Sequence, residues 1–521
     1  MSGSTPYYVT TPIYYVNDAP HIGHAYTTLA CDALARFMRL DGRNVKFLTG
    51  TDEHGQKVEK AARDAGMDPQ AFADMSSRNF RDLAPVMKFT NDDFIRTTEP
   101  RHLRAVQHLW KELMARGQIY LATYAGWYSI RDEAFYTESE LTDGPDGGKL
   151  APTGAEVEWL EEPSYFFRLS EWRDRLLAFY DEHPDFVAPA SRRNEVLSFV
   201  KGGLQDLSIS RTSFRWGVPV PDDPGHVMYV WLDALTNYLT AVGYPDTEKG
   251  EFATFWPADL HMVGKDILRF HAVYWPAFLL AADIAPPRRI FAHGWWTNEG
   301  QKISKSLGNI IEPLKLIERY GLDEVRYFLL REVPFGNDGD FSHRAMVNRI
   351  NGDLANGFGN LAQRALSMIN RNCAAQVPEP GDYTAADERL LGAAQALLDQ
   401  LRGFFADQNL HRALAALWAV VGDANRYVDE QAPWVLQKTD PARMNTVLYV
   451  LGETIRHLAI LAQPVVPGAA ARLLDQLAVA EDERTFAQLG PDHGLKPGTA
   501  LPKPRGVFPR HLEEEERADA G

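Results

Sequence analysis

Two short segments, far apart in the chain, carry side chains that could bind and cleave a nucleoside triphosphate. One reads His21-Ile22-Gly23-His24, and the other reads Lys302-Ile303-Ser304-Lys305-Ser306. Imidazole and ammonium groups can donate hydrogen bonds to phosphate oxygens, and paired cations stabilise the charge that builds up on departing pyrophosphate. Together the segments predict an ATP site at which the bond between the first and second phosphorus breaks, which is adenylyl transfer.

The histidine pair stands where a helix is expected to begin. Tyr7 to Val16 reads as a buried strand, and His24 to Leu40 has apolar residues at helical spacing. Backbone N–H groups and the helix dipole at such a start attract phosphate, and Gly23 leaves room for a close ligand. A match of this kind also occurs in ordinary helix caps, so its position after a first strand carries the argument.

The lysine pair lies in a segment that also contains Gly300 and Gly308, which predicts a loop able to close over ATP. A surface loop with two lysines is, on its own, usually just solvated. Both segments in this order, each beside a predicted strand, favour the ATP site. We expect the catalytic residues to be His21, His24, Lys302 and Lys305, with Gly23 and Ser304 also binding ATP.

Composition limits the kind of protein. Of the 521 residues, 45% are hydrophobic and 24% charged, as in globular proteins with more than one domain. With only Cys31 and Cys373, a disulfide framework and a four-thiolate zinc site are excluded. The start of the chain lacks the features of a secretory signal and no apolar run could span a bilayer, so we expect a cytoplasmic protein without a membrane partner. The net charge of -16 disfavours indiscriminate nucleic-acid coating.

The expected elements form an α/β protein followed by an all-α region. The opening reads strand, helix, strand, with the second strand at Val45 to Leu48, the unit of a Rossmann-like parallel sheet. Short aromatic strands then predict an inserted module, and the α/β pattern resumes in the apolar runs Tyr229 to Leu239, Leu260 to Val263 and Ile290 to His293. After Arg344 an Ala- and Leu-rich sequence with helical periodicity indicates a bundle.

The sequence resembles the class I aminoacyl-tRNA synthetases, whose HIGH and KMSKS motifs match the two segments, and within that class it looks like the methionyl-tRNA synthetase family. The likeness covers nearly the whole chain, and its most specific segments are Thr10–Asn17, Thr49–Gly55, Tyr229–Ala234, Val263–Ile267 and Tyr427–Trp434. The resemblance implies activation of L-methionine with ATP and Mg²⁺, followed by transfer of the methionyl group to tRNA(Met).

On this resemblance the chain divides into a catalytic part and an RNA-reading part. A Rossmann catalytic domain spans 1–117 and 201–297, and a connective module, 118–200, interrupts it. Residues 298–348 hold the KMSKS loop and a stem-contact region, and 349–521 form a helical anticodon-binding domain with a C-terminal tail. No appended dimerisation module is visible, so we expect a monomer.

The resemblance also assigns a methionine pocket. Its residues are Ile13, Tyr15, Asp52, Trp231, Ala234, Tyr238, Ile267 and His271. Asp52 would hold the substrate ammonium group. Trp231, Ala234 and Tyr238 fall at i, i+3 and i+7, so on a helix they present two rings with a small residue between, a slot suited to a thioether but also typical of a plain core. His271 would contact the Tyr15 hydroxyl or the thioether.

The inserted module departs from the family pattern. In many relatives it is a zinc knuckle with paired Cys-x-x-Cys ligands, whereas 127–136 and 149–162 contain no cysteine here. Because structural zinc needs thiolate or imidazole ligands, we expect a zinc-free module, held by aromatic packing, strand pairing and ion pairs such as that of Arg131. The module is too short for an editing domain, so selectivity must come largely from the methionine pocket.

The helical region carries the residues expected to read tRNA. Asn360 and Arg364 share a helix face, and Trp434 follows Pro433 at the end of another helix. Amide and guanidinium donors beside a ring can read unpaired loop nucleotides, and the resemblance assigns these residues to the CAU anticodon. A solvated helix face with a core tryptophan is the plainer alternative.

Three other functions fit part of the sequence. A class I synthetase for another apolar amino acid, such as leucine, isoleucine or valine, would carry a large editing insertion for which the chain has no room. A small-molecule nucleotidylyltransferase would share the N-terminal motif but would need no helical region after Arg344. A catalytically silent RNA-binding homologue would be expected to lose a motif histidine or lysine, and all four are present.

Overall fold

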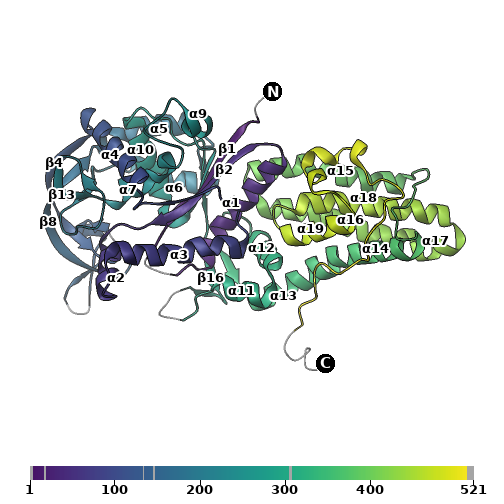
Figure 1. The fold of residues 1–521 in the computed structure, drawn as a ribbon. Coiled ribbons are helices and arrows are strands. Elements are labelled where there is room, and N and C mark those ends of the chain that lie inside the picture. The colour runs from purple at the N-terminus through teal and green to yellow at the C-terminus, as the bar shows by residue number, and fades with distance from the viewer. Residues whose placement is uncertain (1–3, 17–18, 133, 145–146, 304–307, 513–521) are drawn as a thin grey trace. The chain divides into compact units, whose positions relative to one another are not determined.

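The computed structural model describes residues 4–16, 19–132, 134–144, 147–303 and 308–512 (Figure 1). The chain forms two compact units. The first unit comprises 1–5, 21–45 and 293–521, and the second comprises 6–20 and 46–292. Among the helices in the described ranges, none combines the length and apolar character that crossing a membrane requires.

The second unit is built on a parallel sheet with the strand order β3-β2-β1-β14-β15-β9. These strands are β1 Pro6–Tyr15, β2 Asn44–Asp52, β3 Asp93–Arg96, β9 Val187–Ala188, β14 Leu260–Gly264 and β15 Ile290–His293. The expected Rossmann-like sheet is therefore confirmed. β2 runs four residues beyond the predicted end at Leu48, because its polar residues find partners inside the sheet, as in the 2.8 Å bond between the Thr11 and Thr49 hydroxyls.

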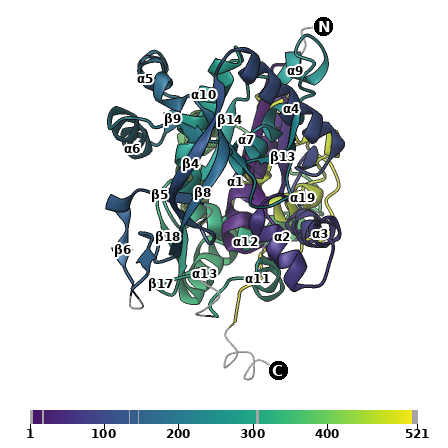
Figure 2. The same cartoon turned by 90° about the vertical axis from the view of Figure 1, so that its left-hand side faces the viewer.

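Helices surround the sheet (Figure 2), and apolar side chains from several of them are buried in its core. They are α2 Gln56–Asp64, α3 Pro69–Met87, α4 Pro100–Ala115, α5 Arg173–Glu182, α6 Ala190–Lys201, α7 Val230–Leu235, α8 Asn237–Thr240, α9 Gly250–Phe255 and α10 Trp275–Ala281. One buried cluster joins Leu48 and Ile95 of the sheet to Trp110 of α4 and Phe278 of α10. This core fixes the strand ends that carry the predicted amino-acid pocket.

The inserted module is an antiparallel sheet with the order β5-β4-β8-β7-β6, extended by β10 beside β8. Its strands are β4 Ile119–Ser129, β5 Ala134–Tyr136, β6 Thr142–Asp143, β7 Lys149–Leu150, β8 Glu156–Phe167 and β10 Leu207–Ser208. Figure 2 shows β4 and β8 side by side over their length. A small sheet of β11 Ser210–Arg211, β13 Asp223–Met228 and β12 Pro219–Val220 follows.

The predicted span of 118–200 for this module does not match the packing. β9 lies in the parallel sheet, where Val187 pairs with Ile290. Apolar side chains of α5 and α6, such as Leu176 and Val200, belong to the core of that sheet. The antiparallel strands before β9 end at Phe167, because the helices that follow have apolar faces that only the larger core can bury.

The first unit contains α1 Ile22–Leu40, a small sheet and the helical bundle. The sheet has the order β17-β16-β18, with β16 Trp296–Asn298, β17 Gln301–Lys302 and β18 Gly339–Phe341. The helices that follow β17 are α11 Pro313–Tyr320, α12 Leu322–Arg331, α13 His343–Arg349, a π-helical turn region Ile350–Gly359, α14 Asn360–Asn372, α15 Ala385–Ala406, α16 Leu410–Gln431, α17 Pro433–Thr439, α18 Pro441–Ala462 and α19 Pro467–Gln476. The predicted bundle is confirmed, with α18 buried along most of its length.

A buried arginine joins α1, α12 and the corner between α18 and α19. The guanidinium of Arg326 donates to Asp32 at 2.7 Å and to the carbonyls of Pro464 and Val465, each at 2.9 Å. Asp32 and Arg326 are both fully buried. Because an unpaired buried charge is costly, this set of partners stabilises the junction only while all of them are present.

Candidate active site

The histidine pair forms the cap of α1. His21 is the N-cap residue, and its Nδ1 accepts from the N–H of Gly23 at 3.0 Å, while Nδ1 of His24 accepts from the N–H of His21 at 3.1 Å. The two rings lie 3.9 Å apart. Because each Nδ1 accepts a hydrogen bond, the proton of each neutral ring is on Nε2, which makes Nε2 the donor toward an anion.

Burial lowers the pKa of His24 well below its ordinary value, and the nearby His21 lowers it further. At neutral pH His24 is therefore an uncharged hydrogen-bond donor. The hydrogen bond from such a neutral donor becomes stronger as negative charge develops on phosphate oxygens. It therefore stabilises the transition state more than the ground state.

Gly23 is needed for the cap itself. A Cβ at this position would lie 2.9 Å from Cε1 and 3.1 Å from Nδ1 of the His21 ring. Any side chain would push that ring out of its capping position. The sequence suggested room for a ligand as the reason for this glycine, and the structure supplies a reason within the chain.

The segment that follows the lysine loop returns to the start of α1. The N–H of Ile22 donates to the carbonyl of Ile311 at 3.0 Å. Asn309 closes the base of the loop, because its amide donates to the carbonyl of Lys302 at 3.0 Å and its own carbonyl accepts from Asn298 at 2.9 Å. Lys302 is exposed on β17. Ser304 and Lys305 lie outside the described residues.

His293, which the sequence analysis did not single out, packs beside the histidine-capped helix. Its Nε2 lies 2.7 Å from the hydroxyl of Thr27 on α1, and its Nδ1 lies 2.8 Å from the carbonyl of Gly294. The ring of Tyr26 meets it edge-on. Its position, immediately before a glycine at the end of a strand, was the available signal.

Part of the predicted methionine pocket forms one apolar cluster in the second unit. Ala234 is buried with Tyr229 and Val230, and Ile13 and Trp231 pack against them. The Trp231 ring also stacks on Phe270, with the ring centroids 3.3 Å apart. Phe270 was not predicted, because it is nearly forty residues away from Trp231 in the sequence and no local pattern links the two rings.

The helix that carries Trp231 and Ala234 is not continuous to Tyr238. α7 ends at Leu235 and α8 begins at Asn237, and the N–H of Thr236 bonds the carbonyl of Asp233 three residues earlier. The tighter turn changes the face that Tyr238 presents. Tyr238 is fully buried, and its ring stacks on His261.

The hydroxyl that His271 contacts is that of Tyr238, not that of Tyr15, which was one of the two expected contacts. Nε2 of His271 lies 2.7 Å from the Tyr238 hydroxyl, and its Nδ1 lies 3.0 Å from the carbonyl of Ile267. Burial lowers the pKa of His271 to about 4, against smaller opposing effects of the Ile267 carbonyl and Asp266. The ring is therefore neutral at pH 7, and it donates through Nδ1 and accepts through Nε2. Tyr15 packs against the cluster of Tyr14, Val16, Val58 and Phe80.

Asp52 is the last residue of β2 and is almost fully buried. Its backbone carbonyl accepts from the N–H of Val16 at 3.3 Å. A carboxylate at the carboxyl end of a parallel strand is well placed to bind a cationic ligand group.

In the inserted module, Asp132 connects the segments 127–136 and 149–162, which zinc ligands would connect in relatives with a zinc knuckle. It accepts from the Tyr136 hydroxyl at 2.9 Å and from the Thr153 hydroxyl, and its N–H donates to Ser129 Oγ at 3.2 Å. Burial works to raise the pKa of Asp132, but hydrogen bonds from Thr153, Tyr136 and Arg131 outweigh it and lower the value. Within the described ranges, no group of His, Cys, Asp or Glu is arranged to bind a metal ion.

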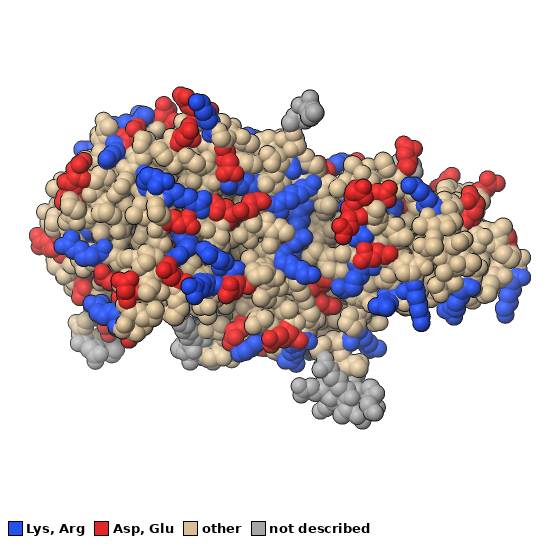
Figure 3. Space-filling view, viewed as in Figure 1, with Lys and Arg blue, Asp and Glu red and all other residues tan. Residues whose placement is uncertain are grey.

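The predicted anticodon residues lie on α14 and α17. Arg364 donates to Asp429 at 2.6 Å, and its guanidinium lies 5.7 Å from the centroid of the Trp434 ring. Trp434 is 45% exposed and Asn360 is exposed on the same helix as Arg364. Trp434 begins α17. On the face seen in Figure 3, basic side chains line the edge of the bundle where Figure 1 places these two helices.

Comparisons with known proteins give the same picture over both parts of the chain. The family described as tRNA synthetases class I (M) matches residues 7–366, and the anticodon binding domain of methionyl tRNA ligase matches residues 377–520. A methionine–tRNA ligase of Mesorhizobium japonicum is 59% identical, with 98% of each chain covered. A methionine–tRNA ligase of Brucella suis is 57% identical, with 98% of this chain and 99% of the relative covered.

Solved structures agree. Mycobacterium tuberculosis methionyl-tRNA synthetase in complex with methionyl-adenylate is similar at a TM-score of 0.95 and 57% identity, over 97% of this chain and 100% of that one. Its apo form is similar at a TM-score of 0.89 and 53% identity, over 98% and 100%.

Proposed function

The chain belongs to the class I tRNA synthetases, among the methionine–tRNA ligases, and from this premise we propose how its residues divide the reaction. As an ATP-dependent methionine–tRNA ligase, it converts methionine and ATP to methionyl-adenylate and pyrophosphate, and then transfers the methionyl group to the 3′ end of tRNA(Met). The relatives support methionine rather than another apolar amino acid as the substrate.

His21, His24, Lys302 and Lys305 bind and activate ATP. The methionine carboxylate attacks the α-phosphorus in line, and no covalent enzyme intermediate is needed. The Nε2–H groups of the histidines donate to phosphate oxygens, and the lysines stabilise the departing pyrophosphate. ATP enters as its Mg²⁺ complex, so part of its charge is already compensated. Gly23 and Ser304 complete the ATP-binding set.

One observation carries this assignment. The hydrogen bond from Ile22 to Ile311 joins the first turn of the histidine-capped helix to the segment that closes the lysine loop. The two motifs are more than 270 residues apart in the sequence, yet they belong to the same compact unit. Convergence of this kind supports one triphosphate site rather than two unrelated surface features.

The methionine side chain binds among Ile13, Tyr15, Trp231, Ala234, Tyr238, Ile267 and His271, and Asp52 binds its ammonium group. The Trp231 and Phe270 stack beside Ala234 supports this role, because a thioether gains from contact with aromatic rings. Neutral His271, held by Tyr238, offers no charge that would repel or bind the thioether. Asn360, Arg364 and Trp434 read the anticodon by hydrogen bonding and stacking.

The proposed cellular setting follows from the substrate. A ligase that charges tRNA works where tRNA is used, which supports a cytoplasmic location. The expected monomeric state and the absence of structural zinc stay predictions.

Amino-acid-dependent exchange of labelled pyrophosphate into ATP tests the proposal. Methionine alone among the standard amino acids should drive rapid exchange, and tRNA(Met) should then accept the methionyl group. Exchange driven by leucine or cysteine, with methionine inert, would overturn the pocket assignment. His24→Asn retains a hydrogen-bonding side chain in the cap and should lower kcat about a hundredfold, since it loses a donor to the developing charge.

A further inference from the structure

The two residues that follow Asp52 are a buried acid, Glu53, and a buried base, His54, and both have strong partners. We propose that Glu53, through Arg96 and Thr98, and Asp233, through His54, are positioning residues that hold the Asp52 carboxylate where it binds the substrate ammonium group. The inference rests on the proposed role of Asp52. Every residue in it belongs to the second unit.

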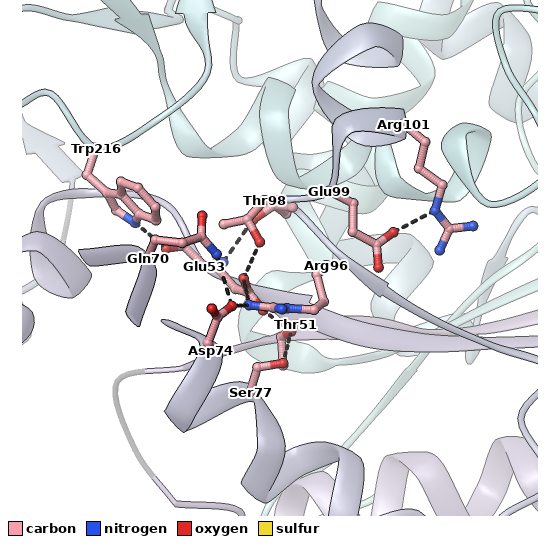
Figure 4. Close-up of polar contacts among 11 residues, drawn as sticks. Thr51, Glu53, Gln70, Asp74, Ser77, Arg96, Thr98, Glu99, Arg101 and Trp216 are labelled. Atoms are coloured by element: carbon pink, nitrogen blue, oxygen red, sulfur yellow. Dashed lines mark hydrogen bonds and ion pairs between the residues drawn. The ribbon is translucent and has the colours of Figure 1, made fainter. Parts of the chain in front are cut away.

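Glu53, the residue after Asp52, is held by several side chains (Figure 4). Its side chain is fully buried, and its two carboxylate oxygens accept from Arg96 at 2.7 and 2.8 Å. Thr98 and Thr51 add hydroxyl donors at 2.6 and 2.7 Å. A bidentate arginine pair with two further donors fixes the carboxylate in position and in orientation.

The backbone of the same segment is held as well. The N–H of Glu53 donates to Thr97 Oγ1 at 2.9 Å, and its carbonyl accepts from the indole N–H of Trp216 at 2.5 Å. The N–H of Gly55 donates to the carbonyl of Trp216 at 3.0 Å. The peptide groups that follow Asp52 therefore have partners in neighbouring parts of the second unit.

His54, the residue after Glu53, is held by Asp233 of α7. Its Nδ1 lies 2.7 Å from one oxygen of Asp233, and Nε2 of His102 lies 2.8 Å from the other. Asp233 and His102 are fully buried. Burial works to raise the pKa of Asp233, but the charge and hydrogen bonds of His54 and His102 outweigh it and bring the value to about 2. Asp233 is thus a carboxylate that accepts from both rings.

The contact between His54 and Asp233 matters because of where Asp233 lies. It lies on α7 between Trp231 and Ala234, the residues predicted to bind the methionine side chain. The bond to His54 therefore links the helix that holds the side chain of the substrate to the strand end that holds its ammonium group. A misplacement of about 1 Å can cost a reaction about a hundredfold, so a link between the two binding elements has a direct use.

Binding of three ligands distinguishes loss of Asp52 positioning from a general disturbance of the fold. Methionine carries both charged groups, methioninol keeps the ammonium group but lacks the carboxylate, and 4-(methylthio)butanoate keeps the carboxylate but lacks the amine. We expect Glu53→Gln and Asp233→Asn each to weaken methionine and methioninol about tenfold, because a buried charged partner is lost. Both variants should bind 4-(methylthio)butanoate and ATP within about twofold of the parent, since neither ligand uses Asp52.

Matched variants complete the design. Glu99→Gln is the control, because Glu99 pairs with Arg101 in the same region of Figure 4 and makes none of the contacts described for the Asp52 segment. Thr98→Val removes one hydroxyl from Glu53 at nearly constant volume and should weaken methioninol about threefold. It keeps the test decisive if Glu53→Gln or Asp233→Asn fails to fold, since no loss of methioninol affinity in Thr98→Val would overturn the inference.

Asp52→Ala separates this inference from the proposed function. If Asp52→Ala leaves methioninol binding unchanged, the role of Asp52 itself is wrong. If Asp52→Ala weakens methioninol but Glu53→Gln and Asp233→Asn do not, the positioning inference alone is overturned. Equal weakening of all three ligands by the positioning variants would show a general structural role and would also overturn it.

Discussion

The segment around Asp52, residues 51–55, and the segment around Lys302 differ in how firmly they are held. In the first, Asp52, Glu53 and His54 are buried, Arg96 of β3 binds Glu53, and Asp233 of α7, which also bonds His102 of α4, binds His54. In the second, Lys302 is exposed on a two-residue strand whose described anchors are the β16 pairing and the amide of Asn309.

The difference in anchoring fits the two roles proposed for Asp52 and Lys302. An ammonium group carries the same charge before, during and after the reaction, so the group that binds it gains by being fixed in advance. The charge on pyrophosphate appears only as the bond breaks, so a cation that acts on it contributes in the transition state. On the proposed roles, the buried Asp52 would serve binding and the exposed Lys302 would serve rate.

The largest expected effect comes from removing the fixed charge. Asp52→Ala should reduce kcat/KM for methionine in pyrophosphate exchange about a hundredfold to a thousandfold, or about 3–4 kcal/mol, mainly through KM. An unchanged KM for methionine would contradict the binding role proposed for the Asp52 segment.

Lys302→Ala tests the role proposed for the exposed lysine segment. It should lower kcat for pyrophosphate exchange about a hundredfold while KM for methionine changes less than about threefold, because the lost interaction forms mainly in the transition state. Lys302→Arg keeps the charge and should recover part of the rate. A rise in KM for methionine without a fall in kcat would contradict this division.

Acid should weaken the second unit through His271. The folded protein takes up this proton only near pH 4, whereas the unfolded chain takes it up near 6.5, so stability falls as the pH drops between these values. From pH 7 to pH 5 this group should cost about 2 kcal/mol of unfolding free energy. Denaturant titrations at both pH values check it, and His271→Gln should reduce the difference. An equal pH dependence in both proteins would be the opposite result.

Trp434→Ala extends the comparison to another exposed group. Loss of a stacking ring should raise KM for tRNA(Met) about tenfold, within the range of about 1–3 kcal/mol per stacked base, and should leave pyrophosphate exchange unchanged. Val435→Ala is the matched control, because Val435 is equally exposed beside it. The same loss in both variants would remove the case for stacking.

The smallest effect is expected from metal removal. Dialysis against a zinc chelator should leave the melting temperature and the circular dichroism of the protein unchanged, because Asp132, Tyr136 and Thr153 join the inserted module without thiolates. Release of stoichiometric zinc together with a lower melting temperature would refute this expectation.

Local pattern was enough to predict much of the fold. The run from Tyr7 to Val16 and the apolar spacing after His24 correspond to β1 and α1 with small shifts of their ends. The C-terminal periodicity corresponds to α15 and α16. Each of these elements buries one regular face. The spacing of its apolar residues is therefore visible within a short stretch of sequence.

Contacts between distant residues were out of reach. His54 and Asp233 are 179 positions apart, and each occurs in a short polar or apolar run that gives no sign of the other. The same holds for Phe270 against Trp231 and for His271, whose partner is Tyr238 instead of Tyr15. The β9 strand was missed because a two-residue strand has no periodicity of its own.

The buried Arg326 has a consequence for anyone who shortens this chain. Its guanidinium bridges Asp32 near the N-terminus and two carbonyls beyond residue 460. A fragment that ended before the bundle would lack both carbonyls that accept hydrogen bonds from Arg326, whose side chain contacts Asp32 of α1. Such a truncated protein should require a compensating apolar substitution at Arg326 and Asp32 together, and not at either alone, to remain folded.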